Sequence, residues 1–174
     1  DNRFVFEDGG YLAGYLQAGS GGTNTLDYSA YNTAVYVDLG EMDTVRKRMV
    51  DQDDDDATPP VAMYPVLSGS ATGLLGINGI QAIVGGHSAG DRLVGPMSAS
   101  TWTVSGANSG TVAGTVTVEG ESTVTYTPLS VTFAGVESLI GQADYSDTFV
   151  VQAAGSLSGT LVGAGASSQA AAMQ

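Results

Sequence analysis

The stretch GVESLIGQADYSDTFVV, residues 135–151, repeats an earlier phrase of the chain, GIQAIVGGHSAGDRLVG, residues 79–95. The phrases align without a gap, and the pairs that match are Ile80 with Val136, Ile83 with Leu139, Gly85 with Gly141, Asp91 with Asp147 and Val94 with Val150. Glycine accepts the backbone conformations of a tight corner, and aspartate can accept hydrogen bonds from backbone amides there. The repeat therefore predicts short strands at its apolar pairs, joined by corners at its glycines and aspartate.

A second repeat relates the two ends of the sequence. FVFEDGGYLAGYL, residues 4–16, aligns with FVVQAAGSLSGTL, residues 149–161. Each end should therefore present a layer that can stack on the kind of layer found at the other end. Head-to-tail contacts of this sort propagate into filaments when they do not close. We expect association with copies of the chain itself or with adjoining repeats, in which the tail from residue 165 onward serves as a partial lid or as a donated strand.

Apolar residues recur with a period of two, which is typical of strands rather than helices. The clearest runs are Val35, Val37 and Leu39; Trp102 and Val104; Val116 and Val118; Val124 and Tyr126; and Val131 and Phe133. The best helix candidate is GEMDTVRKRMV, which begins at Gly40. Repeats separated by long, variable insertions favour a solenoid, in which each coil contacts only its neighbours. We predict an all-β, right-handed parallel β-helix, with a β-sandwich as the alternative.

Domain organisation and composition narrow the possibilities further. The 174 residues, 43% of them hydrophobic, are predicted to form one solenoid segment, 1–174, with a charged loop protruding at 41–60. The net charge is -13, which opposes binding to nucleic acid and anionic membranes. The absence of cysteine excludes disulfides and thiolate metal sites. No apolar run approaches the roughly 20 residues of a membrane-spanning helix.

The beginning of the sequence bears on where the protein acts. Asp1 is the first residue, and the segment after it lacks the basic start and apolar core of a signal peptide. We expect a processed or excised piece whose export signal lies outside this sequence.

Four phrases resemble the repeats of very large exported surface proteins of Gram-negative bacteria. These proteins are of filamentous-haemagglutinin or degenerate haemolysin-type-repeat character, and the phrases lie at 22–39, 76–95, 100–114 and 131–151. The resemblance implies a β-solenoid stretch of a surface adhesin or secreted matrix protein, located extracellularly or at the cell surface. It implies a non-enzymatic structural or adhesive role, and the alternative is a glycan-binding or glycan-cleaving β-helix enzyme.

The acidic run DQDDDDATPP, residues 51–60, is the candidate metal site. Asp51, Asp53 and Asp55 have the alternate spacing by which calcium loops converge oxygens on one ion. However, Asp56 and Ala62 stand where such a loop has glycine and glutamate. Five carboxylates in six residues also repel one another, so a solvated loop without any cofactor is the competing interpretation.

Two groups of residues suggest catalysis at first sight. His87, Ser88 and Asp91 have the residue types of a triad, but no nucleophile elbow surrounds Ser88. Asp144 and Asp147 are close enough in sequence to pair, as glycan hydrolases require of their carboxylates, although the turn repeat already accounts for them. We therefore predict no catalytic residues, and possible partners limited to other copies, adjoining repeats and glycans.

Overall fold

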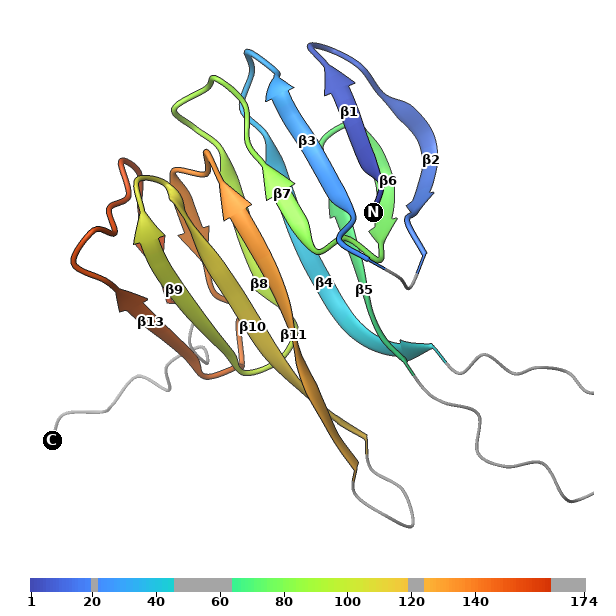
Figure 1. The fold of residues 1–174 in the computed structure, drawn as a ribbon, viewed down its shortest axis with the longest axis vertical. Helices are drawn as coiled ribbons and strands as arrows, with labels where there is room; N and C mark the ends of the chain where they lie inside the picture. The colour runs from blue at the N-terminus through green and yellow to red at the C-terminus, as the bar shows by residue number, and fades with distance from the viewer. Residues whose placement is uncertain (20–21, 46–63, 119–123, 164–174) are drawn as a thin grey trace, which may run out of the picture.

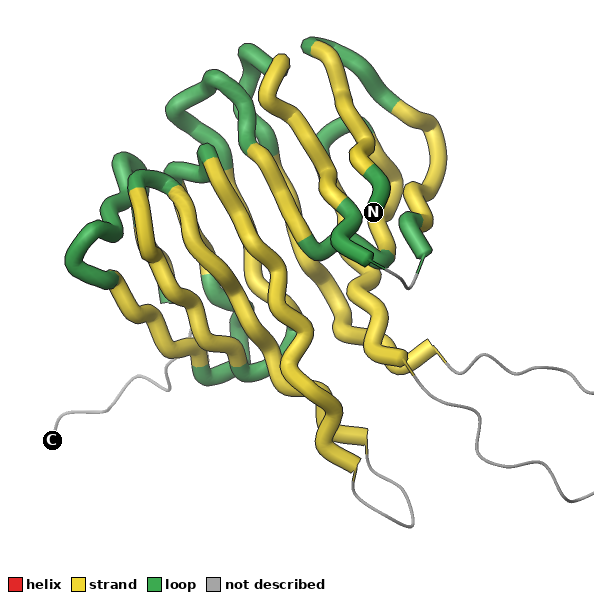
Figure 2. Tube along the Cα trace, in the orientation of Figure 1, coloured by secondary structure: helices red, strands yellow, loops and turns green. Residues whose placement is uncertain are grey.

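A computed structural model describes residues 1–19, 22–45, 64–118 and 124–163. These residues form fourteen strands, and no helix occurs among them. The strands make two seven-stranded sheets, shown in Figures 1 and 2. The prediction of an all-β chain is therefore confirmed.

Each sheet is assembled from distant parts of the chain. The first sheet has the order β1 (Arg3–Glu7), β3 (Thr25–Ala30), β7 (Ala82–Val84), β11 (Val124–Ala134), β10 (Ser109–Val118), β9 (Ser100–Gly106) and β13 (Asp147–Val151). The second has the order β2 (Leu12–Gln17), β6 (Leu74–Asn78), β5 (Tyr64–Ala71), β4 (Tyr36–Val45), β8 (Arg92–Pro96), β12 (Ser138–Ile140) and β14 (Leu161–Val162). The chain passes from one sheet to the other except in two antiparallel meanders, β4–β5–β6 and β9–β10–β11.

Strand pairing is mixed, and this differs from the uniformly parallel pairing that the sequence predicts for a parallel β-helix. Eight neighbouring pairs are parallel, and the four pairs within the meanders are antiparallel. The reason is local, because β5 and β6 are joined by residues 72–73 alone, and β9 and β10 by residues 107–108 alone. Connections of two residues can only reverse the chain, whereas parallel neighbours need a long crossover. Gly73 and Asn108 provide the positive φ angles, 75° and 48°, that these reversals use.

One hydrophobic core lies between the sheets. Side chains from both sheets point into it, so that Leu26, Ile83 and Trp102 of the first sheet join Val37 and Leu93 of the second. All five side chains are buried almost completely. Gly95 of β8 allows the close approach, since a Cβ there would lie 2.8 Å from Cζ2 of Trp102.

The repeat of residues 79–95 and 135–151 is a structural unit. Strands β7 and β8 of the first phrase correspond to β12 and β13 of the second, so both phrases form a strand, a corner and a strand. Gly79 and Gly135 have matching positive φ angles of 73° and 66°. The first unit passes from the first sheet to the second and the second unit passes back. The sequence repeat therefore encodes a change of sheet in either direction.

The segment that begins at Gly40 is not the helix that its sequence pattern suggests, as far as the structure describes it. Strand β4 continues to Val45 and pairs with β5, so this part of the candidate helix, and of the loop predicted at 41–60, is strand. Pairing with a neighbouring strand overrides a weak local helical preference. The remainder of the predicted loop, and the tail from residue 165, lie outside the described residues.

Candidate functional site

The described part of the chain has two end layers, where both sheets stop. We call β1 with β2 the N-terminal end layer and β13 with β14 the C-terminal end layer, because these four strands are the outermost of their sheets. Figure 1 shows β1 and β2 together at one end and β13 at the other. Outermost strands have backbone groups on one side that no neighbouring strand pairs, and such edges are templates for further strands.

Apolar side chains are concentrated on these end layers. Of the eleven large hydrophobic residues that are exposed in the described part of the chain, seven belong to the four outermost strands: Val5, Leu12, Tyr15, Val150, Val151, Leu161 and Val162. Three of these point inward, since each pairs with a core residue: Leu12 with Leu74, Val151 with Val104, and Leu161 with Leu139. They are exposed because no further layer of the described residues covers them.

Aromatic stacks lead from the interior to each end. At the C-terminal end, Phe149 stacks on Trp102 with ring centroids 5.6 Å apart. At the N-terminal end, Phe6 stacks on Tyr28 at 5.4 Å. Phe4, Phe6 and Phe149 are only partly buried against the core. Each stack therefore ends in a ring that retains an uncovered side.

The sequence repeat of the two ends coincides with the end layers. Strand β1 corresponds to residues 148–152, which include most of β13, and β2 corresponds to residues 157–162, which include β14. The two terminal segments thus occupy opposite ends of the molecule.

The N-terminal end layer is attached by a buried carboxylate. Nε of Arg3 donates to Oδ2 of Asp27 at 2.6 Å, and the amide of Ser29 donates to Oδ1 at 2.8 Å. Although burial opposes its ionisation, these hydrogen bonds and the Arg3 charge hold the pKa of Asp27 below its usual value. The side chain of Asp27 is buried while that of Arg3 is largely exposed.

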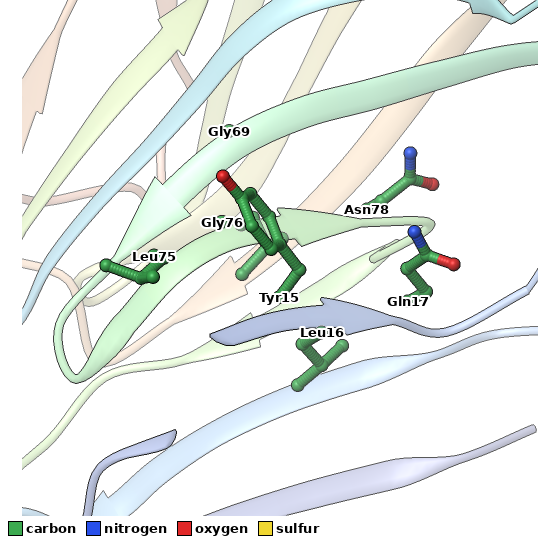
Figure 3. Close-up of a pocket in the computed structure, with 8 residues that line it drawn as sticks. Tyr15, Leu16, Gln17, Gly69, Leu75, Gly76 and Asn78 are labelled. Atoms are coloured by element: carbon green, nitrogen blue, oxygen red, sulfur yellow. The ribbon is translucent and has the colours of Figure 1, made fainter. Parts of the chain in front are cut away.

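An open groove runs over β2, β6 and β5 on the outside of the second sheet (Figure 3). Its volume is about 310 Å³. The Tyr15 ring lies across the groove, and the carboxamides of Gln17 and Asn78 lie beside each other on neighbouring strands (Figure 3). Leu16, between Tyr15 and Gln17, points to the opposite side and is buried.

Glycine makes room for the exposed ring in this groove. A Cβ on Gly76 would lie 2.6 Å from Cδ1 of Tyr15, so a side chain there would displace the ring. Tyr15 is 73% exposed despite this contact. An accessible aromatic face with two carboxamides to one side of it is suited to polar ligands with apolar faces.

The carboxylate of Asp91, in a corner between strands, is buried and binds backbone amides. Its Oδ1 accepts from the amide of Val35 at 2.8 Å, and its Oδ2 accepts from the amide of Gly86 at 2.6 Å. The predicted contact of Asp91 with backbone amides at a bend is therefore confirmed. Glu137 accepts from the amide of Asp91 at 3.1 Å and from the carboxamide of Asn108 at 3.0 Å. Burial, with the nearby Asp91 charge, raises the pKa of Glu137.

Asp147, the repeat equivalent of Asp91, has different contacts. Its Oδ1 accepts from the hydroxyl of Ser100 at 2.5 Å, and its Oδ2 is buried with no hydrogen-bond partner among the described residues. Asp144 is exposed in a turn with a positive φ of 69°. The two carboxylates that the sequence offers as a pair thus lie in different environments.

The residue types of a triad are present but are not arranged as one. The Asp91 oxygens are occupied by backbone amides, and Oγ of Ser88 accepts from the amide of Gly90 at 3.2 Å. No hydrogen bond joins the side chains of His87, Ser88 and Asp91 in the described structure. His87 is exposed on the surface.

The predicted calcium ligands Asp51, Asp53 and Asp55 lie outside the described residues. Within the described ranges, no three histidine, aspartate or glutamate side chains form a group that could hold a metal ion.

The groove was not predicted from the sequence. Some of its residues have a local sequence pattern that indicates their orientation, and others do not. The alternation of Tyr15, Leu16 and Gln17 on one strand is a local signal for two outward side chains. The position of Asn78 beside Gln17 depends on the pairing of β2 with β6, for which the local sequence has no signal.

No long apolar helix that could cross a membrane is found in the part of the chain that the structure describes. The chain matches no protein-family model, no curated protein sequence and no solved structure.

Proposed function

We propose that this chain is a non-enzymatic structural or adhesive segment of an exported bacterial surface or matrix protein, located outside the cell, and that it assembles end to end. In this proposal the stacked strands act as a right-handed solenoid segment in which two meanders replace single turns. The partners are copies of the chain or adjoining repeats of a longer one.

The concentration of uncovered apolar residues on the two end layers carries this proposal. Soluble monomers rarely leave apolar edge strands open, because such edges pair with other chains. Solenoids normally cover their ends with polar caps. Here the inward-facing Val151 and Leu161 are exposed at one end, and the rings of Phe4 and Phe6 are only partly buried at the other. Covering them with another layer would extend the same core.

Sedimentation velocity and negative-stain imaging at micromolar concentrations test the assembly. We expect concentration-dependent oligomers and fibres of the unmodified chain. Val151→Lys should abolish them, because it introduces an inward-pointing charge on an edge strand. Met97→Lys is the matched control, since Met97 is also exposed but lies outside the end layers. A monodisperse monomer of 17.6 kDa at all concentrations would contradict the proposal.

The groove over β2, β6 and β5 supports a second candidate function, the binding of a glycan. Sugar rings have apolar faces that stack on tyrosine and hydroxyl groups that bond to carboxamides. Tyr15, Gln17 and Asn78 provide both kinds of contact within one groove. This activity is compatible with an adhesive segment and requires no catalytic group.

A glycan array followed by calorimetry tests this second function. Tyr15→Ala should weaken binding at least about fivefold, because it removes the stacking face. Tyr11→Ala is the control, since Tyr11 is 78% exposed but does not line the groove. Binding that is indifferent to Tyr15 would reject the groove. Turnover of a polysaccharide, lost on mutation of Asp144 or Asp147, would instead favour a glycan-cleaving enzyme.

Calcium binding at Asp51, Asp53 and Asp55 stays a prediction. Calorimetry should detect binding that a chelator reverses and that replacement of the three residues by asparagine removes. If no heat of binding is found, or if it survives the replacement, the site is withdrawn.

A further inference from the structure

Resting on the proposed assembly, we infer its geometry: copies of the chain join head to tail and in register, so that β13 of one copy pairs in parallel with β1 of the next, and β14 with β2. The partner is a second copy of this chain. The joint continues both sheets and the core between them.

Strand direction determines which joints are possible. In the first sheet, β1, β3, β7 and β11 are parallel, the two antiparallel steps through β10 restore the direction at β9, and β13 is parallel to β9. The second sheet likewise contains two antiparallel steps between β2 and β14. The outermost strands of each sheet therefore run in the same direction, and a copy stacked head to tail adds parallel strands to both sheets at once.

A head-to-head joint would have a different strand pattern and outcome. It would place β1 against β1 of the other copy in the antiparallel sense. Such a two-fold contact closes after two copies, whereas a head-to-tail contact leaves a free end for the next copy. The repeat between the two ends of the sequence favours the second arrangement, because each end then receives the kind of layer that it resembles.

The terminal repeat also specifies the register. Placing each residue beside its repeat equivalent puts Phe149 beside Phe4 of the next copy, and Val151 beside Phe6. All four side chains face the core. Phe4 pairs with core residue Leu26 and Phe149 with core residue Trp102. Phe6 and Val151 each lie two residues further along the same strand and so point to the same side. A slip of one residue would set inward side chains beside outward ones, which register in a half-buried sheet does not tolerate.

The second sheet and the charges agree with this register. Leu161 falls beside Leu16, so an exposed inward leucine meets the buried leucine of the opposite end. Glu7 falls beside Gln152, and therefore no like charges face each other there despite the net charge of -13. The joint covers the inward apolar groups that both end layers leave open.

Cysteine cross-linking tests orientation and register together, because the chain has no cysteine of its own. Val5 and Val150 are repeat equivalents on the outward face and are 54% and 43% exposed. Within one copy they lie on opposite edges of a seven-stranded sheet, about 29 Å apart at the usual strand spacing, which is too far for a disulfide. In adjacent parallel strands, residues in register lie within disulfide reach.

The full chain carrying both Val5→Cys and Val150→Cys should form a ladder of covalent multimers on mild oxidation. Mass spectrometry should find a disulfide between positions 5 and 150. The register control replaces Thr148 instead of Val150, with Val5→Cys kept, because this outward position is two residues out of register and diagonal neighbours lie about 7–8 Å apart. This control should give no ladder. Circular dichroism verifies that each variant is folded, and a mixture of the two single variants, which should give only heterodimers, repeats the test with one change per chain.

The other outcomes overturn the inference in distinguishable ways. Covalent dimers from either single variant alone would show a head-to-head or tail-to-tail joint. A ladder from the position-148 control would show another register. Fibres that sediment but do not cross-link would place the joint elsewhere while the proposed assembly stands. Absence of both sedimenting species and cross-links would reject the assembly itself.

Discussion

At the residue scale, single side chains in the corners hold distant strands together. Asp91 connects its own corner, through Gly86, to the beginning of β4, through Val35. Asn108 extends this network, because its carboxamide also bonds to the side chain and amide of Ser158. Buried polar groups of this kind contribute most when every partner is satisfied.

The two repeat-equivalent aspartates should respond differently to the same change. Asp91→Asn replaces one of two accepting oxygens with an NH₂ group that would face a backbone amide, so we expect a loss of about 1.5–3 kcal/mol in the free energy of unfolding. Asp147→Asn should cost less than about 1 kcal/mol, because Oδ2 of Asp147 has no partner to lose. Urea unfolding of both variants measures this difference. Equal losses would show that the Asp91 contacts are not the cause.

Truncation of the largest buried side chain should be severe. Trp102 is fully buried, stacks on Phe149 and makes an edge contact with Phe133. We expect Trp102→Ala to lower the free energy of unfolding by about 3–5 kcal/mol. Tyr11→Ala, at an exposed site, should change it by no more than about 0.5 kcal/mol. Chemical denaturation monitored by circular dichroism tests both, and similar values for the two variants would contradict the core assignment.

Asp27 and Glu137 have pKa values shifted in opposite directions, so their contributions to stability should depend on pH in opposite ways. The pKa of Asp27 is lowered, so its contribution is present above the ordinary value of 3.8 and is lost as the pH falls through the folded-state value. The pKa of Glu137 is raised, so its contribution is present below the ordinary value of 4.5 and is lost as the pH rises through the folded-state value.

Unfolding measured from pH 2.5 to 7 tests these signs. The advantage of the unmodified chain over Asp27→Asn should shrink as the pH falls below about 4, and its advantage over Glu137→Gln should shrink as the pH rises above about 4.5. Parallel curves for the three proteins would contradict both assignments.

At the scale of elements, the sequence predicts the strands better than their neighbours. The repeat at 79–95 and 135–151 correctly indicates β7, β8, β12 and β13, because alternation and glycine corners are local signals. The meanders are harder to predict from the sequence. The two-residue reversal at 107–108 is visible as a turn, but nothing local specifies that β11 then pairs with β7 rather than with a later strand. The segment from Gly40 shows the opposite error, since its helical pattern is overridden by pairing with β5.

The reversal between β5 and β6 should depend on glycine for two reasons. Gly73 has a φ of 75°, and a Cβ there would lie 2.8 Å from the carbonyl oxygen of Gly10. Gly9 has a similar φ of 74° with open space around it. Gly9→Ala should therefore cost about 1–2 kcal/mol from backbone strain alone, and Gly73→Ala at least about 1 kcal/mol more from the overlap. Thermal and urea unfolding compare them, and equal costs would mean that the overlap relaxes freely.

At the scale of the whole molecule, order should decrease from the middle of the stack to its ends. Strands β4, β8, β7 and β11 have neighbours on both sides, whereas β1, β2, β13 and β14 have a neighbour on one side only among the strands that the structure describes. This arrangement follows from pairing between strands that are far apart in the sequence. The sequence therefore predicts only the similarity of the two ends, and not which strands lie in the middle. The groove is equally a product of the whole molecule, because its residues come from β2, β5 and β6.

Hydrogen exchange should reveal this gradient. In dilute solution, amides of the four outermost strands should exchange faster than those of the central strands, because local opening there breaks fewer contacts. At concentrations where copies associate, protection should rise on the outermost strands and change little at the centre. Uniform protection in both conditions would argue against association through the end layers.

The two meanders have a consequence for synthesis of the chain. Strand β3 has β1 and β7 as neighbours, and β7 is translated only after the whole β4–β5–β6 meander. The meander in turn remains without its other neighbour until β8 is translated. The nascent chain therefore cannot add finished layers one at a time behind the ribosome, and its central layers close only after later strands emerge.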